Sequence, residues 1–213
     1  MNAFVLAGGA SSRMGRDKAL LDFGGRPLIE HALALLRSLN FEPRICGSRL
    51  DLARFAPVVP DNHPGCGPLA GIEAALSISG SDLNLFLPVD LPLLPIAFLR
   101  WMVERATTTD TVATVPLFGG RPQPLCAVYT RRLVHGIHEA LAAGQYKMMT
   151  AIETAASALG EPIDAFHVES VAAALIPETW PAHPPVQQWF RNINTPADYE
   201  QLLSHLEQKR AFQ

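Results

Sequence analysis

The chain has 213 residues, of which 48% are hydrophobic, and it carries 17 Lys and Arg against 20 Asp and Glu. This length suits a single domain spanning 1–213. The formal net charge of −3 excludes the broad basic surface with which proteins bind nucleic acid or an anionic membrane, so any anionic ligand must be held by local groups.

Cysteine content and hydropathy point to one compartment. The three cysteines, at positions 46, 66 and 126, provide neither a disulfide framework nor paired metal-ligand spacing, which favours a reducing environment. The first apolar run ends at Ala7 with no basic residue ahead of it, unlike a signal peptide. The apolar stretch 83–99 contains Asp90 and three prolines and is no transmembrane helix. We expect a soluble, cytoplasmic protein without nucleic-acid or membrane partners.

The first structured stretch is an apolar run, 4–7, that ends in the paired glycines Gly8 and Gly9. Such a short run predicts a buried parallel strand leading directly into a loop. Glycines, with Gly15 as the third, let backbone N–H groups approach an anion. Hydroxyl and cationic donors accompany them, namely Ser11, Ser12, Arg13 and Lys18. The loop therefore predicts a polyphosphate site, the alternative being a Gly/Ser-rich turn with two solvated basic side chains.

Two common phosphate-binding motifs do not fit this loop. Five residues separate Gly9 from Gly15, where a P-loop has four, and Lys18 is not followed by Ser or Thr. The adjacent glycines Gly8 and Gly9 also break the dinucleotide fingerprint G-x-G-x-x-G. The loop thus represents a different phosphate-binding type.

The next elements bring Asp61 to the same edge of the sheet. We predict a helix over 28–39 that Pro27 introduces, short strands at 43–47 and 57–59, and a short helix from about 49 between them. Asp61 follows the third strand directly. Because open parallel sheets bind ligands at the carboxyl ends of their strands, Asp61 should face the crevice of the Gly8 loop. An Asx turn that fixes the loop explains Asp61 equally well.

A glycine-punctuated loop, 64–68, then precedes a predicted helix over 69–77, whose first N–H groups should point into the crevice. The buried strand predicted at 83–89 delivers Asp90 to the same edge. One carboxylate combined with substrate phosphates is the ligand set that Mg²⁺ prefers, so Asp90 is the candidate Mg²⁺ ligand. The alternative, a cap for the helix predicted at 96–106, places Asp90 too far upstream.

The second half predicts strands at 111–115 and 124–129 and helices at 131–142 and 148–159. The prolines in 121–124 exclude an ordinary mid-strand segment, which puts Arg121 and Gln123 at the rim of an acceptor pocket. His135 and His138 have i, i+3 spacing, but no third metal ligand of matching spacing is evident. We assign both histidines to a surface or half-buried helix face.

The last part predicts a strand at 162–168, an irregular insertion at 170–188 and a short strand at 189–193. Asn192 and Asn194 would alternate onto one face of that strand. Thr195 should cap the closing helix, with Pro196 at its first position. The alternation of strands and helices indicates a three-layer α/β/α, Rossmann-like fold with a mainly parallel sheet and one antiparallel excursion.

The pattern Leu-Ala-Gly-Gly-x-Ser-Ser-Arg-Met-Gly-x-Asp-Lys at 6–18 resembles the signature loop of nucleotidyltransferases that activate a phosphorylated substrate with an NTP. The similarity is greatest to the molybdenum cofactor guanylyltransferases, and it continues in order through the blocks 61–72, 88–92, 121–125 and 192–196. The resemblance implies the nucleotidyltransferase fold, a nucleotide-binding N-terminal half and an acceptor-binding C-terminal half.

The resemblance also implies a reaction, in which GTP and molybdopterin form molybdopterin guanine dinucleotide and pyrophosphate with Mg²⁺ as cofactor. The groups expected to act in catalysis are Arg13, Lys18 and Asp90, with Asp90 holding the metal. The expected nucleotide-binding residues are Leu6, Ala7, Gly8, Gly9, Gly15, Lys18, Asp61, Gly67, Pro68, Leu69 and Asp90. The expected acceptor-binding residues are Arg121, Gln123, Lys147, Asn192 and Asn194, although Lys147 also suits a solvated linker.

Three alternatives remain open. Two are sister enzymes on the same fold: a cytidylyltransferase for the same cofactor and a sugar-phosphate nucleotidylyltransferase. The third is a non-catalytic nucleotide-binding assembly factor, which would not need Arg13, Lys18 and Asp90 together. Molybdoenzymes and other cofactor-biosynthesis proteins are the candidate protein partners.

Overall fold

The computed structural model describes residues 1–8, 17–174 and 184–211, and side chains as far as 203. Of the predicted site residues, Gly9, Arg13 and Gly15 lie outside this part, and so do Ser11 and Ser12.

The described residues form one eight-stranded sheet with the order β3-β2-β1-β4-β7-β5-β6, and β8 also pairs with β5. The strands are β1 (Asn2–Leu6), β2 (Arg44–Cys46), β3 (Val58–Val59), β4 (Leu83–Pro88), β5 (Ala113–Phe118), β6 (Arg121–Pro122), β7 (Ala127–Thr130) and β8 (Ile163–His167). The predicted α/β sheet is confirmed, but it is mixed: β7 pairs antiparallel with β4 and β5, and β6 pairs antiparallel with β5.

The register aligns the carboxyl ends of the parallel core strands. Leu6 of β1 pairs with Cys46 of β2 and with Pro88 of β4, and Cys46 pairs with Val59 of β3. The residues that follow these ends therefore meet at one edge of the sheet. β5 runs in the same direction as β4, because both are antiparallel to β7.

Helices cover both faces of the sheet, as predicted. The α-helices are α1 (Leu28–Arg37), α2 (Pro68–Ile78), α3 (Ile96–Thr108), α4 (Val134–Ala142), α5 (Met148–Leu159), α6 (Val168–Ala174) and α7 (Pro196–Ala211); the 3₁₀ helices are η1 (Lys18–Leu20), η2 (Leu50–Arg54), η3 (Arg131–Leu133) and η4 (Val186–Gln188). No helix in the described ranges is both long and apolar enough to cross a membrane.

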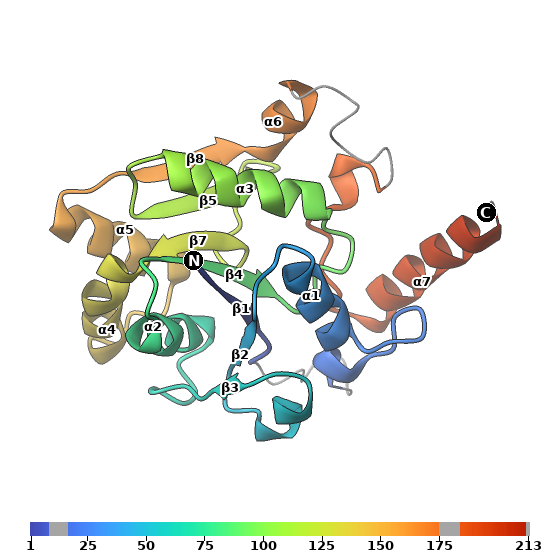
Figure 1. Cartoon of the computed structure of the whole chain (residues 1–213), viewed down its shortest axis with the longest axis horizontal. Helices are drawn as coiled ribbons and strands as arrows, with labels where there is room; N and C mark the ends of the chain where they lie inside the picture. Colours follow the sequence, from blue (N-terminus) through green and yellow to red (C-terminus); the bar gives the residue numbers. More distant parts are fainter. Residues whose placement is uncertain (9–16, 175–183, 212–213) are drawn as a thin grey trace.

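Strand periodicity divides the core into two layers. On β1, Ala3 and Val5 pack with α1 and α3, whereas Phe4 and Leu6 pack with α2, α4 and α5, as alternating side chains must. Figure 1 shows α2, α4 and α5 together on the left and α7 projecting at the right. Both layers bury apolar surface, which is the main stabilising contribution to such a fold.

Two predictions for the C-terminal part were wrong. Residues 189–193 form no strand; Trp189 and Phe190 are instead buried against Phe98 of α3, with ring centroids 5.5 and 5.6 Å away. The start of the predicted irregular insertion lies in α6, and residues 175–183 are outside the described ranges. The predicted cap of α7 is confirmed, because the Thr195 hydroxyl accepts a hydrogen bond from the Asp198 N–H at 3.1 Å.

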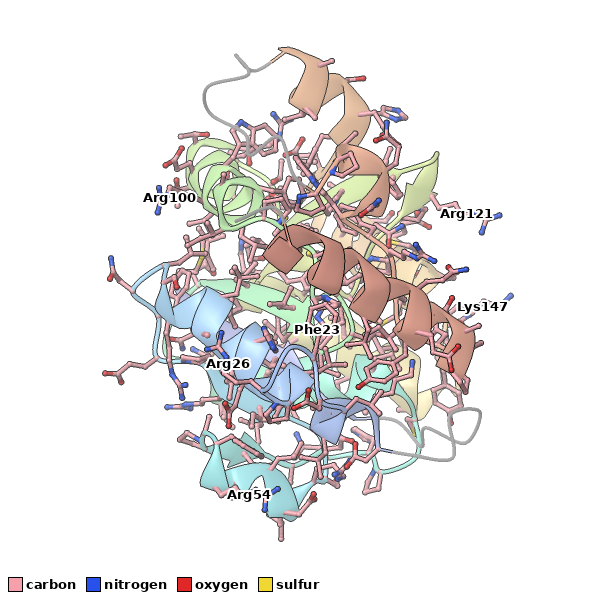
Figure 2. The ribbon with its side chains drawn as sticks, turned by 90° about the vertical axis from the view of Figure 1, so that its right-hand side faces the viewer. Phe23, Arg26, Arg54, Arg100, Arg121 and Lys147 are labelled. Carbon is pink, nitrogen blue, oxygen red and sulfur yellow. The ribbon has the colours of Figure 1, made fainter. Side chains whose placement is uncertain are left out.

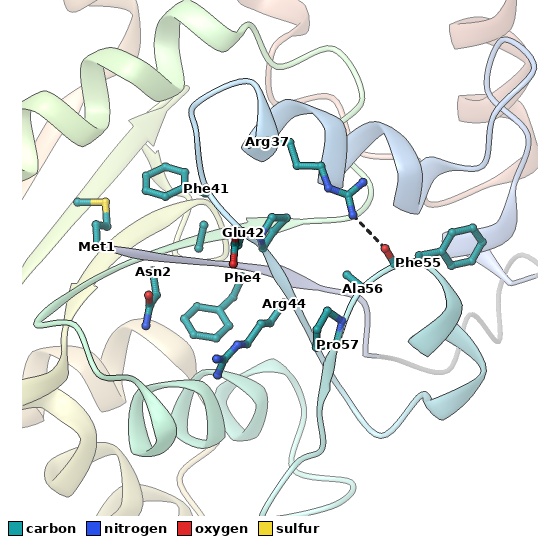
Figure 3. Close-up of a pocket in the computed structure, with 12 residues that line it drawn as sticks. Met1, Asn2, Phe4, Arg37, Phe41, Glu42, Arg44, Phe55, Ala56 and Pro57 are labelled. Atoms are coloured by element: carbon teal, nitrogen blue, oxygen red, sulfur yellow. Dashed lines mark hydrogen bonds between the residues drawn. The ribbon is translucent and has the colours of Figure 1, made fainter.

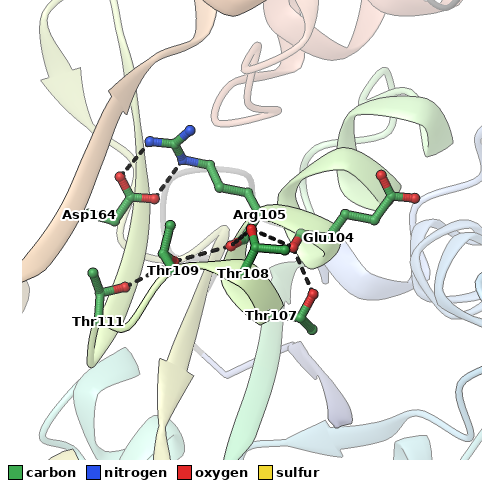
Figure 4. Close-up of polar contacts among 7 residues, drawn as sticks. All are labelled: Glu104, Arg105, Thr107, Thr108, Thr109, Thr111 and Asp164. Carbon is green, nitrogen blue, oxygen red and sulfur yellow. Dashed lines mark hydrogen bonds and ion pairs between the residues drawn. The ribbon is translucent and has the colours of Figure 1, made fainter.

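A polar network joins α3 to β8 (Figure 4). The Arg105 guanidinium donates two hydrogen bonds to the Asp164 carboxylate, at 2.6 and 2.7 Å. The same guanidinium lies over the rings of Trp101 and Phe166. Hydroxyls of a threonine run at 107–109 donate to the Glu104 and Arg105 carbonyls near the end of α3, and the Arg105 carbonyl also accepts from the Thr109 N–H at 3.0 Å. This geometry fixes the end of α3 against the outer part of the sheet.

The close contact between α4 and α5 gives a first stability prediction. A Cβ at Gly136 would lie 2.6 Å from the Ala155 Cβ and 2.8 Å from its Cα. Gly136→Ala should therefore push the helices apart and lower the free energy of unfolding by about 1–3 kcal/mol. The better helix propensity of Ala, worth up to about 1 kcal/mol, offsets this loss only in part. Urea unfolding measures this change. Gly80→Ala is the control, since no atom lies within 4 Å there; equal stability of both variants would contradict the prediction.

Candidate functional site

A cavity of about 160 Å³ opens at the carboxyl edge of the sheet. Its lining comes from the end of β1, from η1, from the start of α2 and from the residues after β4. The members used below are Leu6, Ala7, Gly8, Lys18, Pro68 and Asp90. The structure therefore brings together six of the predicted nucleotide-binding residues, from four segments of the chain.

Asp90 and Lys18 form the charged centre of this cavity. The Lys18 Nζ lies 3.3 Å from Asp90 Oδ2, and the two side chains are 21% and 19% exposed. Burial raises the pKa of Asp90, while the Lys18 charge opposes that shift. The pair is thus shielded enough for its charges to act strongly on a bound anion or cation.

Asn194 joins this pair. The Lys18 Nζ donates a 2.6 Å hydrogen bond to Asn194 Oδ1, and the backbone N–H of Ile193 donates to the Asp90 carbonyl at 3.3 Å. From its sequence position, Asn194 is predicted in the acceptor half, away from Lys18. The structure places Asn194 in contact with a predicted phosphate-binding residue, and both Asn192 and Asn194 are exposed.

Asp61 follows β3 and carries an unsatisfied buried atom. Its Oδ1 is buried and has no hydrogen-bond partner among the described residues, and burial raises the pKa of its carboxyl group. Gly71 of α2 permits this placement, because a Cβ there would lie 3.3 Å from Oδ1. A buried acceptor without a donor is costly, so this oxygen is suited to accept a hydrogen bond from a ligand.

The neighbouring thiol is not a nucleophile. Burial and the Asp61 charge both raise the pKa of Cys46, so the thiol stays protonated and unreactive.

Two glycines let β1 and β2 approach closely where the loop begins. Gly47 has φ +129°, and a Cβ on it would lie 3.0 Å from both the Cα and the N of Gly8. Any side chain at position 47 would displace the start of the predicted phosphate loop. Sequence reasoning missed Gly47, since the glycine follows a weak strand pattern and its neighbour lies 39 positions earlier.

Arg49 supports η1 from outside the cavity and was also missed. Its guanidinium pairs with the Asp17 carboxylate and with Asp51 at 2.6 Å. Asp17 Oδ1 in turn accepts from the Ala19 N–H at 3.0 Å, which caps η1. Arg49 therefore fixes the backbone that presents Lys18, and only the cluster of charges around position 50 could have suggested such a role.

The start of α2 reaches the cavity through its backbone. Gly67 has φ +74°, and Pro68 occupies the first helical turn. The Leu69 side chain is fully buried in the core, so only its main chain is free to face a ligand. The predicted set 67–69 therefore offers backbone groups and one proline rather than polar side chains.

The other predicted acceptor residues occupy an exposed rim. Arg121 belongs to the short edge strand β6, and the Gln123 side chain donates to the Arg121 carbonyl at 3.2 Å. Figure 2 shows Arg121 and Lys147 extending outward on the same side of the molecule. Both side chains are exposed and thus accessible to a ligand phosphate.

A larger cavity, of about 580 Å³, lies at the opposite edge, by the amino ends of β1 and β2 (Figure 3). Arg37 at its wall donates to the Phe55 carbonyl at 3.0 Å. None of the predicted site residues lines this cavity. The smaller cavity around Asp90 is therefore the candidate site.

This arrangement can hold a polyphosphate and one hard cation. Lys18 supplies a positive charge, Gly8 and the α2 start supply backbone N–H groups, and Asp90 supplies the carboxylate that Mg²⁺ binds together with phosphate oxygens. Burial raises the pKa of the Asp90 carboxyl group because water stabilises its negative charge only weakly. A bound metal cation would supply that stabilisation.

The chain is similar to proteins of one family. Residues 3–159 match the family described as MobA-like NTP transferase domain. A probable molybdenum cofactor guanylyltransferase of Carboxydothermus hydrogenoformans is 33% identical over 200 residues, covering 93% of both chains. One of the same name from Bacillus cereus is 29% identical over 209 residues, covering 95% of both.

Solved structures share the fold. Molybdopterin-guanine dinucleotide biosynthesis protein A of Archaeoglobus fulgidus has a TM-score of 0.78 at 23% identity, covering 98% of this chain and all of that one (100%). A putative glucose-1-phosphate thymidylyltransferase of Bacillus anthracis has a TM-score of 0.72 at 16% identity, covering 96% and 94%.

Proposed function

The chain belongs to the MobA-like NTP transferase family, and we propose on this basis that it transfers GMP from GTP to the terminal phosphate of molybdopterin, forming molybdopterin guanine dinucleotide. The nucleotide and the acceptor come from the names of relatives that match nearly the whole chain. The Lys18–Asp90 pair in the cavity at the sheet edge is the observation that carries the reaction class.

In the proposed reaction, an oxygen of the acceptor phosphate attacks the α-phosphorus of GTP. A new P–O bond forms, the bond to the β-phosphate breaks, and pyrophosphate leaves with the electron pair. The acceptor phosphate is already an anion, so no protein nucleophile or strong base is needed, and positioning and electrostatics supply the rate.

Each residue then has a defined role. Lys18, with Arg13, neutralises charge on the departing pyrophosphate, and Asp90 holds the cation. Bound Mg²⁺ supplies charge neutralisation and a template for the phosphate oxygens. Gly8, Gly9 and Gly15 offer backbone donors to the phosphates. Asp61, through its unpartnered Oδ1, accepts from the base or the sugar.

The acceptor is proposed to lie beside the nucleotide, toward Arg121, Gln123, Lys147 and Asn192. The whole chain, 1–213, would act as one domain, with the reaction in the cytoplasm. Molybdoenzymes and other cofactor-biosynthesis proteins are the proposed recipients of the product.

A substrate matrix tests this function. Purified protein with Mg²⁺ is given each NTP, alone or with molybdopterin or glucose 1-phosphate, and pyrophosphate is measured. We expect release that requires both GTP and molybdopterin. Release with CTP in place of GTP would identify a cytidylyltransferase, and release with the sugar phosphate a sugar nucleotidyltransferase. Nucleotide binding without turnover on any acceptor would support an assembly factor.

The two asparagines should behave differently. Asn194→Ala removes the amide that holds Lys18 at 2.6 Å, so we expect GTP affinity to fall about tenfold, the effect of losing a hydrogen bond to a charged group. Asn192→Ala should weaken molybdopterin binding by a few-fold and leave GTP binding unchanged. Calorimetry with each ligand distinguishes the two, and normal GTP affinity in Asn194→Ala would show that Lys18 does not depend on that contact.

A further inference from the structure

A second cluster of potential ligand groups lies on the α2–α4 side of the sheet, outside the candidate site. His63 belongs to the loop after β3, Glu73 to α2 and His138 to α4. One ligand atom from each residue lies within 4.8 Å of the others, and the rings of His63 and His138 are 5.2 Å apart between centroids. Residues 75 positions apart in the chain thus converge.

This cluster contains only one of the two histidines, His135 and His138, whose i, i+3 spacing is noted in the sequence. His135, the i−3 neighbour of His138, has a side chain that is 83% exposed and pairs with Glu139. The assignment of His135 to a surface helix face is consistent with this exposure. His138 instead turns toward α2, where its Nδ1 lies 3.4 Å from Glu73 Oε1.

Glu73 is unusual among the three because it is only 4% exposed. Asn62 Nδ2 donates to its Oε2 at 2.9 Å, and Ser77 Oγ donates to its Oε1 at 3.1 Å. No Lys or Arg within the described ranges pairs with it; His138 is its ion-pair candidate there. Buried carboxylates normally pair with a cation or bind a metal, and these two neutral donors fix the orientation of the carboxylate as outer partners of metal ligands do.

We propose that His63, Glu73 and His138 bind one divalent transition-metal ion, for which Zn²⁺ is the best match. Two imidazoles and one carboxylate are a common zinc ligand set that leaves a fourth position for water. Mg²⁺ prefers oxygen ligands, so this site should discriminate against the ion expected at Asp90. Small rotations of the partly exposed His63 and His138 side chains would bring the three ligand atoms to coordination distance.

Such an ion would have a structural consequence for the nucleotide site. His63 lies two positions after Asp61, in the loop that leads to the start of α2 at Pro68. Binding would fasten this loop to α2 and α4, which reduces the freedom of the Asp61 backbone. The bound ion would therefore stabilise the loop next to Asp61, the proposed base- or sugar-binding residue.

Zn²⁺ titration of the metal-free protein, with a chromophoric chelator as competitor and excess Mg²⁺ present, tests the proposal. We expect one Zn²⁺ per chain for the unaltered protein and for Asp90→Asn. His138→Ala should lower the affinity more than about 100-fold, because losing an outer partner of a ligand alone costs 10- to 100-fold. Its exposed side chain, at 52%, makes misfolding of this variant a small concern, and Glu73→Gln provides an independent variant.

His135→Ala is the matched control, since it removes an exposed histidine from the same helix and should leave Zn²⁺ affinity unchanged. Unaltered protein that binds no Zn²⁺ at micromolar concentration would overturn the proposal, leaving a hydrogen-bonded cluster. Binding that survives in both His138→Ala and Glu73→Gln, or that His135→Ala weakens equally, would overturn it as well. None of these readouts depends on nucleotidyl transfer, so they fail or succeed separately from the proposed function.

Discussion

Asp90→Asn is expected to lower turnover by about 10²- to 10³-fold, the usual effect of removing one preorganised charge-stabilising group. The amide keeps the size of the side chain but loses the charge that would hold Mg²⁺ and that pairs with Lys18 at 3.3 Å. Initial rates at saturating GTP and molybdopterin measure the effect.

A matched control comes from the other end of the same strand. Asp82→Asn changes an exposed carboxylate just before β4 and should leave turnover unchanged. Thermal melting of both variants checks the fold. Near-normal turnover of Asp90→Asn at ordinary Mg²⁺ would remove Asp90 from the metal site.

The pKa of Asp90 adds a pH dependence to this expectation. Burial raises that pKa, and only the ionised carboxylate binds a cation, so activity should be lost on the acid side as pH falls through it. The loss should begin at a higher pH than an exposed aspartate would give.

Lys18→Ala should weaken GTP binding by roughly 10- to 100-fold, the effect of losing hydrogen bonds to a charged group, and should weaken GMP binding far less. The reason is positional: we place the Lys18 charge on the β- and γ-phosphates, which GMP lacks. Calorimetry with both nucleotides measures the difference.

Arg100→Ala is the control for general charge effects. Arg100 is an exposed cation on α3, on the opposite side of the molecule from Arg121 in Figure 2, and its loss should affect neither nucleotide. Equal losses of GTP and GMP affinity in Lys18→Ala would show that Lys18 acts through folding or elsewhere on the nucleotide.

Much of the fold was predictable because its signals are local. The apolar runs that became β1 and β4 end in glycine or proline, and the helical periodicity before Asn40 gave α1 to within two residues of its end. The prolines in 121–124 correctly excluded a mid-strand segment, but the two-residue edge strand β6 was not predicted. Asp61 and Asp90 reached the same edge because each lies two positions after the end of a parallel strand.

The failures share a different cause. Residues 189–193 were predicted as a strand, but Trp189 and Phe190 pack against Phe98 of α3 and form no strand. No local pattern distinguishes the two outcomes. The contacts of Asn194 with Lys18 and of Arg49 with Asp17 join residues 176 and 32 positions apart. Such tertiary contacts have no signature in sequence spacing.

The contacts that join residues 18–22 to residues 194–199 have a consequence for biosynthesis. Lys18 donates a hydrogen bond to Asn194, and the Tyr199 hydroxyl donates to the Asp22 carbonyl beside η1. A ribosome releases the chain from its N-terminus, and folding during synthesis generally begins there. β1 can meet β4 once residue 88 has emerged, but Lys18 gains its amide partner only after position 194 has been made. A nascent chain therefore cannot complete the contacts around Lys18 before residue 194 has been made.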